Sequence, residues 1–284
     1  MAGTTSGSPR ARVLGAWLRD ARQAANLGVR ELARALEIEH AYISRWETAE
    51  RIPRPEDVAM LLTAVGVNGS ERDRLVSLAK AAVEPNWVAL GEPGASEALA
   101  ALIEFERTAK HFTEWSPAVI PGILQTGDYA RAIMVDAGVP SQEIDQRVTV
   151  RLGRRDVLTR RNAVSFLALV GQEALRQVIG GPEVMADQLR LLLQLSDLPS
   201  VTLQAVPTGQ GWHPGIPGPF ELLEFESGRP IVHLEHLRSA LFLYENQEDL
   251  QAYVDAVTTI RKAAMSPKES NHLIAETVSA LGKT

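Results

Sequence analysis

His233-Leu234-Glu235-His236 brings together residue types that bind metal ions or transfer protons. The segment lacks the HExxH spacing that places two histidines on one face of a helix. If it is a strand, His233 and Glu235 face one side of the sheet and His236 faces the other. A metal site would then need further ligands, and no nearby motif supplies them. Glu173 and His213 also have no spacing that pairs them.

Motifs of other enzyme classes are absent from the sequence as well. It contains no GxSxG, no phosphate-binding Walker loop and no GxGxxG after a predicted strand. It has no cysteine, which excludes disulfides, thiolate zinc sites, iron–sulfur clusters and cysteine nucleophiles. We therefore expect no enzyme activity, no metal site and no cofactor.

A different set of hydrogen-bonding side chains lies in Val29–Trp46, whose sequence is VRELARALEIEHAYISRW. Its apolar residues have the spacing of two short helices joined by a turn. These residues are Leu32, Leu36, Ile38, Ile43 and Trp46, with the small Ala33 between them. The inner face of the second helix is then fixed, and its outer face is free to enter the major groove of DNA. That outer face consists of Glu39, His40, Ala41, Ser44 and Arg45.

The charge distribution favours the same interpretation. Residues 10–54 hold nine arginines against six acidic residues, whereas residues 83–284 hold 17 basic against 25 acidic residues. The net charge of the whole chain is −6. A basic segment on an acidic body is typical of a DNA-binding domain carried by a larger domain. The alternative is a chance fluctuation of charge along the chain.

The segment from Leu14 to Val67 resembles the λ-repressor-like (Xre-type) helix-turn-helix regulators. The motifs that carry the resemblance are LGAWLRDAR, ELARAL, ISRWE and RIPRPEDVAMLLTAVGV. The resemblance implies five helices, double-stranded DNA as partner and a structural role for Glu47. It also implies DNA contacts, to base edges from Arg45 and His40, to bases or phosphates from Ser44 and Tyr42, and to phosphates from Arg19, Arg30 and Arg51. The alternatives are solvated surface arginines and a helical bundle that binds only protein.

The sequence departs from this family pattern at several positions. Glu37 stands where the family has a turn glycine, which costs up to about 1 kcal/mol if the residue is left-handed. Glu39 and Glu50 place two further carboxylates near the DNA phosphates. We therefore expect modest affinity from a single copy and a homodimer bound to a two-fold operator.

The pattern of apolar residues predicts a multidomain chain with four parts. A disordered tail (1–11) precedes an all-α helix-turn-helix domain (12–83), a Gly/Pro-rich linker (84–96) and an α+β domain (97–284). The α+β domain is expected to have a mainly antiparallel sheet with helices on one side. Its predicted helices are Glu97–Trp115, Asp128–Gly138, Gln142–Arg161, Pro182–Ser196, Gln247–Ala264 and Pro267–Gly282. Its predicted strands are Val164–Val170, Val201–Val206, Phe220–Glu226, Ile231–Leu237 and Ala240–Glu245.

Residues 97–280 resemble the WhiJ-like or antitoxin-like C-terminal domain, of unknown function, that many actinobacterial Xre-type regulators carry. The resemblance rests on PGILQT at 121–126 followed by Tyr129-Ala130-Arg131, and on spaced motifs such as Gly180-Gly181-Pro182 and Gly218-Pro219-Phe220. It implies a regulator that binds a small protein encoded by a neighbouring gene.

Several residues of this domain are candidates for binding a ligand or a partner. The PGILQT turn and the following helix could line a pocket, or form a helix cap packed on the sheet. A row of arginines could hold an anion, or form ion pairs with neighbouring acids. The aromatic-bearing loop at 209–219 could be a lid or a partner-binding loop, or a disordered connection. The candidate residues are Gln125, Tyr129, Arg131, Arg151, Arg155, Trp212 and His213.

Three functions follow as expectations. The first is a sequence-specific transcription regulator whose C-terminal domain controls its output, and the second is an antitoxin-like module that holds a small partner protein. The third is a regulator that senses a metabolite. Apolar runs such as Ser165–Val170 are too short to cross a bilayer, and MAGTTSGSPRAR has no signal-peptide core. We therefore expect no membrane contact and a cytoplasmic protein that associates with the nucleoid when bound to DNA.

Overall fold

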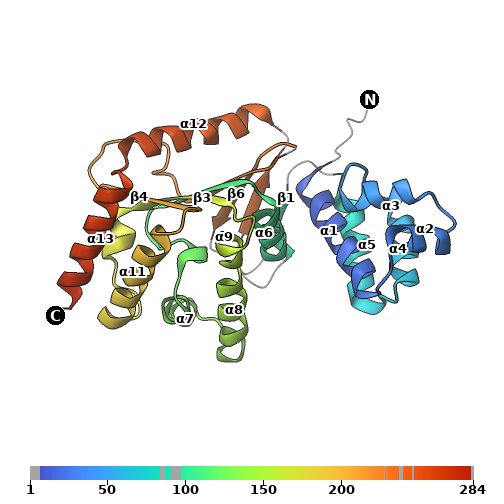
Figure 1. Cartoon of the computed structure of the whole chain (residues 1–284), viewed down its shortest axis with the longest axis horizontal. Coiled ribbons are helices and arrows are strands. Elements are labelled where there is room, and N and C mark those ends of the chain that lie inside the picture. The colour runs from blue at the N-terminus through green and yellow to red at the C-terminus, as the bar shows by residue number, and fades with distance from the viewer. Residues whose placement is uncertain are drawn as a thin grey trace.

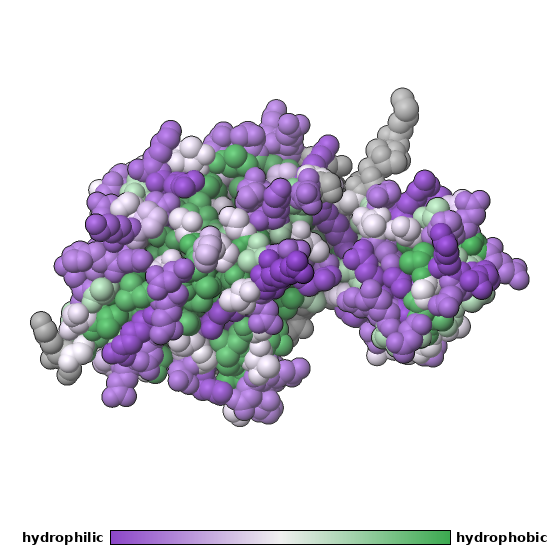
Figure 2. All heavy atoms as spheres, in the orientation of Figure 1, coloured by the Kyte–Doolittle hydropathy of each residue, from purple (hydrophilic) through white to green (hydrophobic). Residues whose placement is uncertain are grey.

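Five helices form the N-terminal part of the chain, residues 7–83, which we call the head. They are α1 (Pro9–Ala24), α2 (Val29–Ala35), α3 (His40–Glu47), α4 (Pro55–Ala64) and α5 (Gly69–Ala81), as the sequence predicts. The computed structural model describes residues 7–83, 87–90, 97–226, 228–236, 239–244 and 246–282. The part after residue 86 is called the body. In Figure 1, α1 lies on the side of the head next to the body, and α2 lies farther away. Figure 2 shows the same face of the molecule, on which hydrophilic residues cover most of the head.

The first helix begins earlier than predicted. Ser8 accepts a hydrogen bond from the Ala11 amide (3.1 Å) and donates one to the Ala82 carbonyl (2.7 Å). Pro9 occupies the first turn, where its missing N–H costs nothing. The predicted disordered tail 1–11 is therefore wrong for residues 8–11, because this cap ties them to the end of α5. Residues 1–6 lie outside the described part.

The turn between α2 and α3 contains a left-handed residue at the position for which the sequence analysis weighed the cost of replacing a glycine. Glu37 has φ 54°. The Ile38 amide donates to the Ala33 carbonyl (3.0 Å) and the Glu37 amide to the Arg34 carbonyl (3.3 Å). This is the pair of bonds that closes a helix when the next residue is left-handed. A glutamate at this position carries strain that a glycine would avoid.

The body is built on a seven-stranded sheet with the order β1-β7-β6-β5-β2-β3-β4. The β2–β3 and β3–β4 pairs are parallel, and the other four pairs are antiparallel. The sheet is therefore mixed and mostly antiparallel, close to the expected α+β class. The strands are β1 (Trp87–Leu90), β2 (His111–Ser116), β3 (Ser165–Gly171), β4 (Val201–Val206), β5 (Phe220–Glu224), β6 (Ile231–His236) and β7 (Ser239–Leu243).

Helices cover both faces of this sheet (Figure 1), so the predicted placement on one side is wrong. On one face α12 (Gln247–Ala263) packs Ile260 against Trp115 and Phe220, and Leu250 against Leu222. The apolar side of α12, which carries Leu250, Ala256 and Ile260, is thus part of the core. The elements associated with the other face are α6 (Glu97–Thr108), η1 (Gly122–Leu124), α7 (Gly127–Asp136), α8 (Ser141–Gly153), α9 (Asp156–Thr159), α10 (Gln172–Arg176), α11 (Pro182–Ser196) and α13 (Pro267–Leu281).

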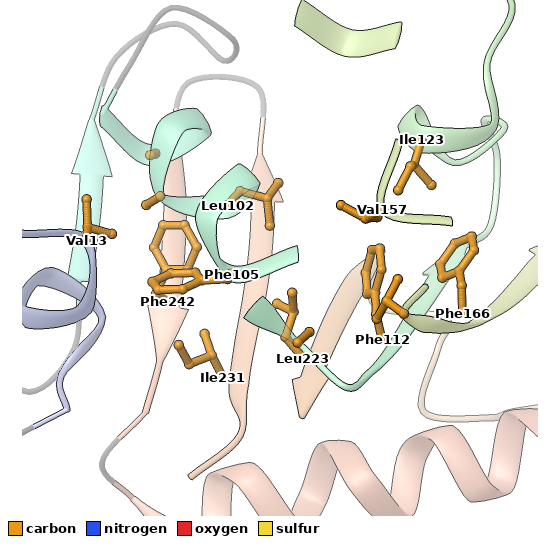
Figure 3. Close-up of a cluster of buried hydrophobic side chains, with 14 of the residues drawn as sticks. Val13, Leu102, Phe105, Phe112, Ile123, Val157, Phe166, Leu223, Ile231 and Phe242 are labelled. Atoms are coloured by element: carbon orange, nitrogen blue, oxygen red, sulfur yellow. The ribbon is translucent and has the colours of Figure 1, made fainter. Parts of the chain in front are cut away.

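Aromatic side chains form much of this second core (Figure 3). Phe105 of α6 meets Phe242 of β7 edge-to-face at 5.5 Å between ring centroids. Phe112 and Phe166 lie 4.7 Å apart across the parallel β2–β3 pair. The cluster is continuous with that of the head, since Val13 of α1 belongs to it.

Two predicted helices differ from the structure. The helix predicted over Glu97–Trp115 ends at Thr108, and β2 follows it. The helix predicted over Gln142–Arg161 divides into α8 and α9 around Arg154. Within the predicted linker 84–96, Trp87–Leu90 forms β1 and pairs with β7, while residues 84–86 and 91–96 lie outside the described part.

Candidate nucleic-acid interface

The two helices of the predicted helix-turn-helix are held by an apolar inner face. Leu32 of α2 and Ile43 of α3 have no exposed surface, and Trp46 is also buried. These residues belong to one cluster with Leu14 and Leu18 of α1. The inner face of α3 is therefore fixed by three helices, and its outer face points away from the core.

Helix α1 holds the C-terminal end of α3 by close contact. A Cβ on Gly15 would lie 2.5 Å from the Trp46 carbonyl oxygen, so only glycine allows this approach. Glu47 forms a buried ion pair with Arg22, in which Nε and Nη2 donate to the two carboxylate oxygens at 2.6 and 2.9 Å. The hydrogen bond that Arg22 donates to Glu47 raises the pKa of Arg22. This confirms the expected structural role of Glu47.

The outer face of α3 carries side chains that are available to a partner. Glu39, His40, Ser44 and Arg45 are exposed, and Ala41 is half-buried. Within the described residues, the side chains of His40, Ser44 and Arg45 make no hydrogen bond or ion pair. A guanidinium, an imidazole and a hydroxyl on one exposed helix face supply the donors and acceptors that read base edges.

The predicted phosphate-contacting arginines differ in their surroundings. Arg30 is exposed on the first turn of α2 and has no partner among the described residues. Arg51 lies over the ring of Tyr42, 4.8 Å from its centroid, just beyond α3. Arg19 donates to the Glu47 carbonyl at 2.8 Å, so it supports α3 directly. The structure thus leaves Arg30 the freest of the three.

In the body, the PGILQT turn is held by side chains that the sequence singles out. Gln125 is buried, donates to the Ile120 carbonyl (2.8 Å) and accepts from Arg151 (2.9 Å). Arg155 donates to the Ile123 carbonyl (3.3 Å) and to that of Gln125. Tyr129 is fully buried, and its hydroxyl accepts from the Ile120 amide (3.3 Å). These groups satisfy one another, which is the helix-cap alternative for this turn.

A group of buried charges in the body was not anticipated. We call it the Glu114 cluster; it consists of Glu106, Glu114, Arg154, Glu221 and His233. Arg154 donates to both carboxylate oxygens of Glu106, at 2.9 and 2.5 Å. Burial acts to lower the pKa of Arg154, but Glu106, with Glu221 and Glu114, raises it overall. Burial, and then the charge of Glu221, hold the pKa of Glu114 well above its usual range.

Comparison with known proteins gives two matches to family models. Residues 13–75 match a helix-turn-helix domain, and residues 99–276 match a domain of unknown function, DUF5753. The chain belongs to the DUF5753 family. The DUF5753 match runs from within α6 to within α13 and omits β1, and the helix-turn-helix match runs from within α1 to within α5. Neither a search of curated proteins nor one of solved structures gave a match.

The remaining predicted residues lie on the surface of the DUF5753 domain. Arg131 of α7 pairs with Asp145 of α8 at 2.5 Å, and both are exposed. His213 packs edge-on against Trp115 at 5.6 Å, and Trp115 donates to the Gly215 carbonyl at 2.8 Å. Trp212 is 79% exposed. The loop at 209–219 is therefore anchored on the sheet, and it presents two large apolar side chains outward, Trp212 and Ile216.

The sequence analysis did not anticipate the Glu114 cluster. Glu114 falls within the helix predicted over Glu97–Trp115, whereas the structure places it on β2. His233 was considered only as a metal ligand, and its pairing with Glu221 depends on strand register. In the described part, no group of three His, Cys, Asp or Glu residues could hold a metal ion. The same part contains no helix with the length and apolar character needed to cross a bilayer.

Proposed function

We propose that this protein is a sequence-specific transcription regulator of the Xre type that inserts α3 into the major groove of double-stranded DNA. The observation that carries the proposal is the contrast between the two faces of α3. The inner face is buried and its C-terminal end is tied to α1, whereas His40, Ser44 and Arg45 are exposed and uncommitted. The match to a helix-turn-helix family supports it. We propose no enzymatic activity.

The charges around α3 favour binding as a homodimer. The exposed Arg30, Arg45 and Arg51 favour DNA, but the exposed Glu37, Glu39 and Glu50 oppose it near the phosphates. One head therefore has few net phosphate contacts. Two heads on a two-fold operator, with half-sites about one helical turn apart, double the contacts.

Control by the body is supported by the contacts of α1. Arg12 lies over the rings of Phe225 (4.0 Å) and Tyr244 (6.0 Å), and burial lowers its pKa. A Cβ on Gly228 would lie 2.5 Å from Arg12 Nη2, so the β5–β6 connection closes tightly on this guanidinium. Because α1 also holds α3 through Arg22, movement of this sheet edge would change the position of the recognition helix.

A second candidate function is an antitoxin-like role in which the body holds a small partner protein encoded nearby. The anchored loop with the exposed Trp212 favours it, because rigid exposed tryptophans are common anchors of protein interfaces. Copurification of the neighbouring gene product with the wild-type chain, and its loss with Trp212→Ala, would support this role. Control by a metabolite is the third proposal. All three roles are compatible with a cytoplasmic protein that associates with the nucleoid when bound to DNA.

The test of DNA binding is fluorescence anisotropy with DNA from upstream of the protein's own gene, against scrambled DNA at several salt concentrations. We expect at least about a thousandfold preference for the native sequence and a steep salt dependence. Arg45→Ala should reduce the preference, whereas Arg176→Ala, an equal charge change on an exposed site of α10, should not. Equal weak binding to both DNAs would favour the partner-binding role.

A further inference from the structure

A row of polar side chains crosses the sheet beneath α6. Glu114 of β2 is directly opposite Glu221 of β5, and Glu221 is directly opposite His233 of β6. Residues that are directly opposite share one face of a sheet, so these three side chains point to the same side. They are 8%, 9% and 3% exposed. Two carboxylates therefore lie side by side in the interior.

The two charged side chains that cover this row pair with each other. Glu106 of α6 and Arg154 at the end of α8 form a two-bond ion pair. His233 Nδ1 is 3.5 Å from Glu221 Oε1. Glu114 has no hydrogen-bond partner among the described residues. The cluster consequently has more negative than positive groups, although Arg154 lies close enough to attract both Glu114 and Glu221.

Hydrogen-bond acceptors remain unused inside the cluster. The buried carboxylate oxygens Glu114 Oε2 and Glu221 Oε2 have no partner among the described residues. Buried carboxylate oxygens normally accept hydrogen bonds, because a buried acceptor without a hydrogen bond destabilises the fold. These oxygens suit a hydrogen-bond donor, and a positively charged donor suits them best because carboxylates outnumber cations in the cluster.

A polar route connects the cluster with the surface. Glu235 follows His233 by two residues on β6, so it lies on the same face, and it is exposed. Arg151 is half-buried and interacts electrostatically with both Glu235 and Glu114. Charged groups thus extend from solvent to the buried oxygens.

We propose that the Glu114 cluster binds a small organic cation, with an ammonium or guanidinium group placed between the carboxylates of Glu114 and Glu221. Glu106 already binds the guanidinium of Arg154 in this manner, so the environment suits such a group. An organic cation fits better than a metal ion, because no described group of three His, Cys, Asp or Glu residues has metal-binding geometry. The ligand is then the signal that the body reads.

Binding of the cation is coupled to a proton on Glu114. The groups facing Glu114 are Glu221 of β5, Glu106 of α6, Arg154 and Arg151 of α8, and His233 and Glu235 of β6. Burial and Glu221 raise the pKa of Glu114, whereas His233 and Arg154 outweigh burial and lower that of Glu221. Glu114 therefore holds a proton more tightly than Glu221 does. A cation between the two carboxylates competes with that proton, so its affinity increases with pH.

The site also adjoins the contact between body and head. The His233 ring stacks on Phe242 at 4.7 Å, and Phe242 lies 5.4 Å from Trp87. Arg10 of α1 lies over Trp87 at 5.3 Å. An effect of the cation on DNA affinity rests on the regulatory function proposed above, but binding of the cation itself does not.

The test is isothermal titration calorimetry of the full chain with butylguanidinium and butylammonium chloride, using sodium chloride as the ionic control. We expect at least one cation to bind with a Kd of about 1 mM or tighter. Glu114→Gln and Glu221→Gln should each weaken binding at least about tenfold. Glu224→Gln, the same change at an exposed position of β5, should leave the affinity within about twofold.

Circular dichroism tests whether each variant folds. If Glu114→Gln does not fold, the affinity of Glu221→Gln tests the proposal. Affinity should increase with pH, with proton release visible as a dependence of the heat on the buffer. No binding of either cation at about 20 mM would overturn the proposal, as would equal weakening by Glu224→Gln. Because calorimetry uses no DNA, failure here is distinguishable from failure of DNA binding.

Discussion

The ion pair between Arg22 and Glu47 is the feature that we expect to fix the recognition helix most strongly. Its side chains are 10% and 5% exposed. Arg22 makes two hydrogen bonds to the Glu47 carboxylate and a third to the Leu27 carbonyl at 2.7 Å. Replacing either partner by methionine leaves the other charge buried, which typically costs about 3–5 kcal/mol.

This cost is a large fraction of the stability of a small domain, which is about 5–15 kcal/mol. Arg22→Met and Glu47→Met should each speed hydrogen exchange of the α3 amides at least about a hundredfold, because local opening follows the free energy of unfolding. The double variant places two apolar side chains together and should be far more stable than the sum of the single losses predicts. Mass spectrometry of peptides from α3 measures this exchange separately from exchange in the body.

The matched control is Arg54→Met in the same head. Arg54 pairs with Asp57 at 2.9 Å, but its side chain is 76% exposed, so exchange of the α3 amides should hardly change. Additive losses in the Arg22 and Glu47 variants would refute the reasoning. So would an effect of Arg54→Met as large as that of Arg22→Met.

Three further predictions concern the head. Arg30→Ala should weaken binding to all DNA sequences alike and reduce the salt slope by about one, as measured by anisotropy; a change in sequence preference would contradict a phosphate contact. Glu37→Gly should stabilise the head by up to about 1 kcal/mol in denaturant unfolding, because glycine removes the left-handed strain; destabilisation would show that the strain is negligible. The hydrogen bond from Arg54 lowers the pKa of Asp57, so its stabilising contribution is present above the unfolded pKa of about 3.9 and is lost as the pH falls through the folded value. The stability difference between wild type and Asp57→Asn in denaturant unfolding should therefore shrink in acid, and a constant difference would contradict this.

The fold of the head could be predicted because its determinants are local. The spacing of Leu32, Ile43 and Trp46 defines the buried face of each helix, and these residues are buried as expected. Glu37 has the left-handed conformation that its place in the turn requires. The start of α1 was missed because its cap reaches the Ala82 carbonyl, 74 residues away, a contact that local pattern does not contain.

The body was less predictable because its determinants are non-local. Phe112 and Trp115 continue the apolar spacing of α6, so five of the six residues of β2 were assigned to that helix. Their strand conformation depends on pairing with β3 and β5, far along the chain. Helix α12 was not expected to cover the second face of the sheet. Its apolar side packs on the sheet, but the sequence alone does not distinguish a helix side that packs on the core from one that packs on another chain.

The candidate site was predictable in the head and much less so in the body. The exposed residues of α3 follow from the periodicity of its buried ones, whereas Arg19 was assigned to phosphate although it bonds the Glu47 carbonyl. Burial of Glu114 and Glu221 arises from strand register and from the cover by α6 and α8. Neither feature can be read from the spacing of these residues in the chain.

The most direct test of the central claim is selection of bound sequences from a random pool of DNA duplexes by the wild-type chain and by Arg45→Ala. The account predicts that the wild type enriches one two-fold motif. It also predicts that Arg45→Ala loses discrimination at a guanine, by about 1–3 kcal/mol, while the other positions persist. No enriched motif, or an unchanged motif for Arg45→Ala, would contradict the claim that the outer face of α3 reads DNA.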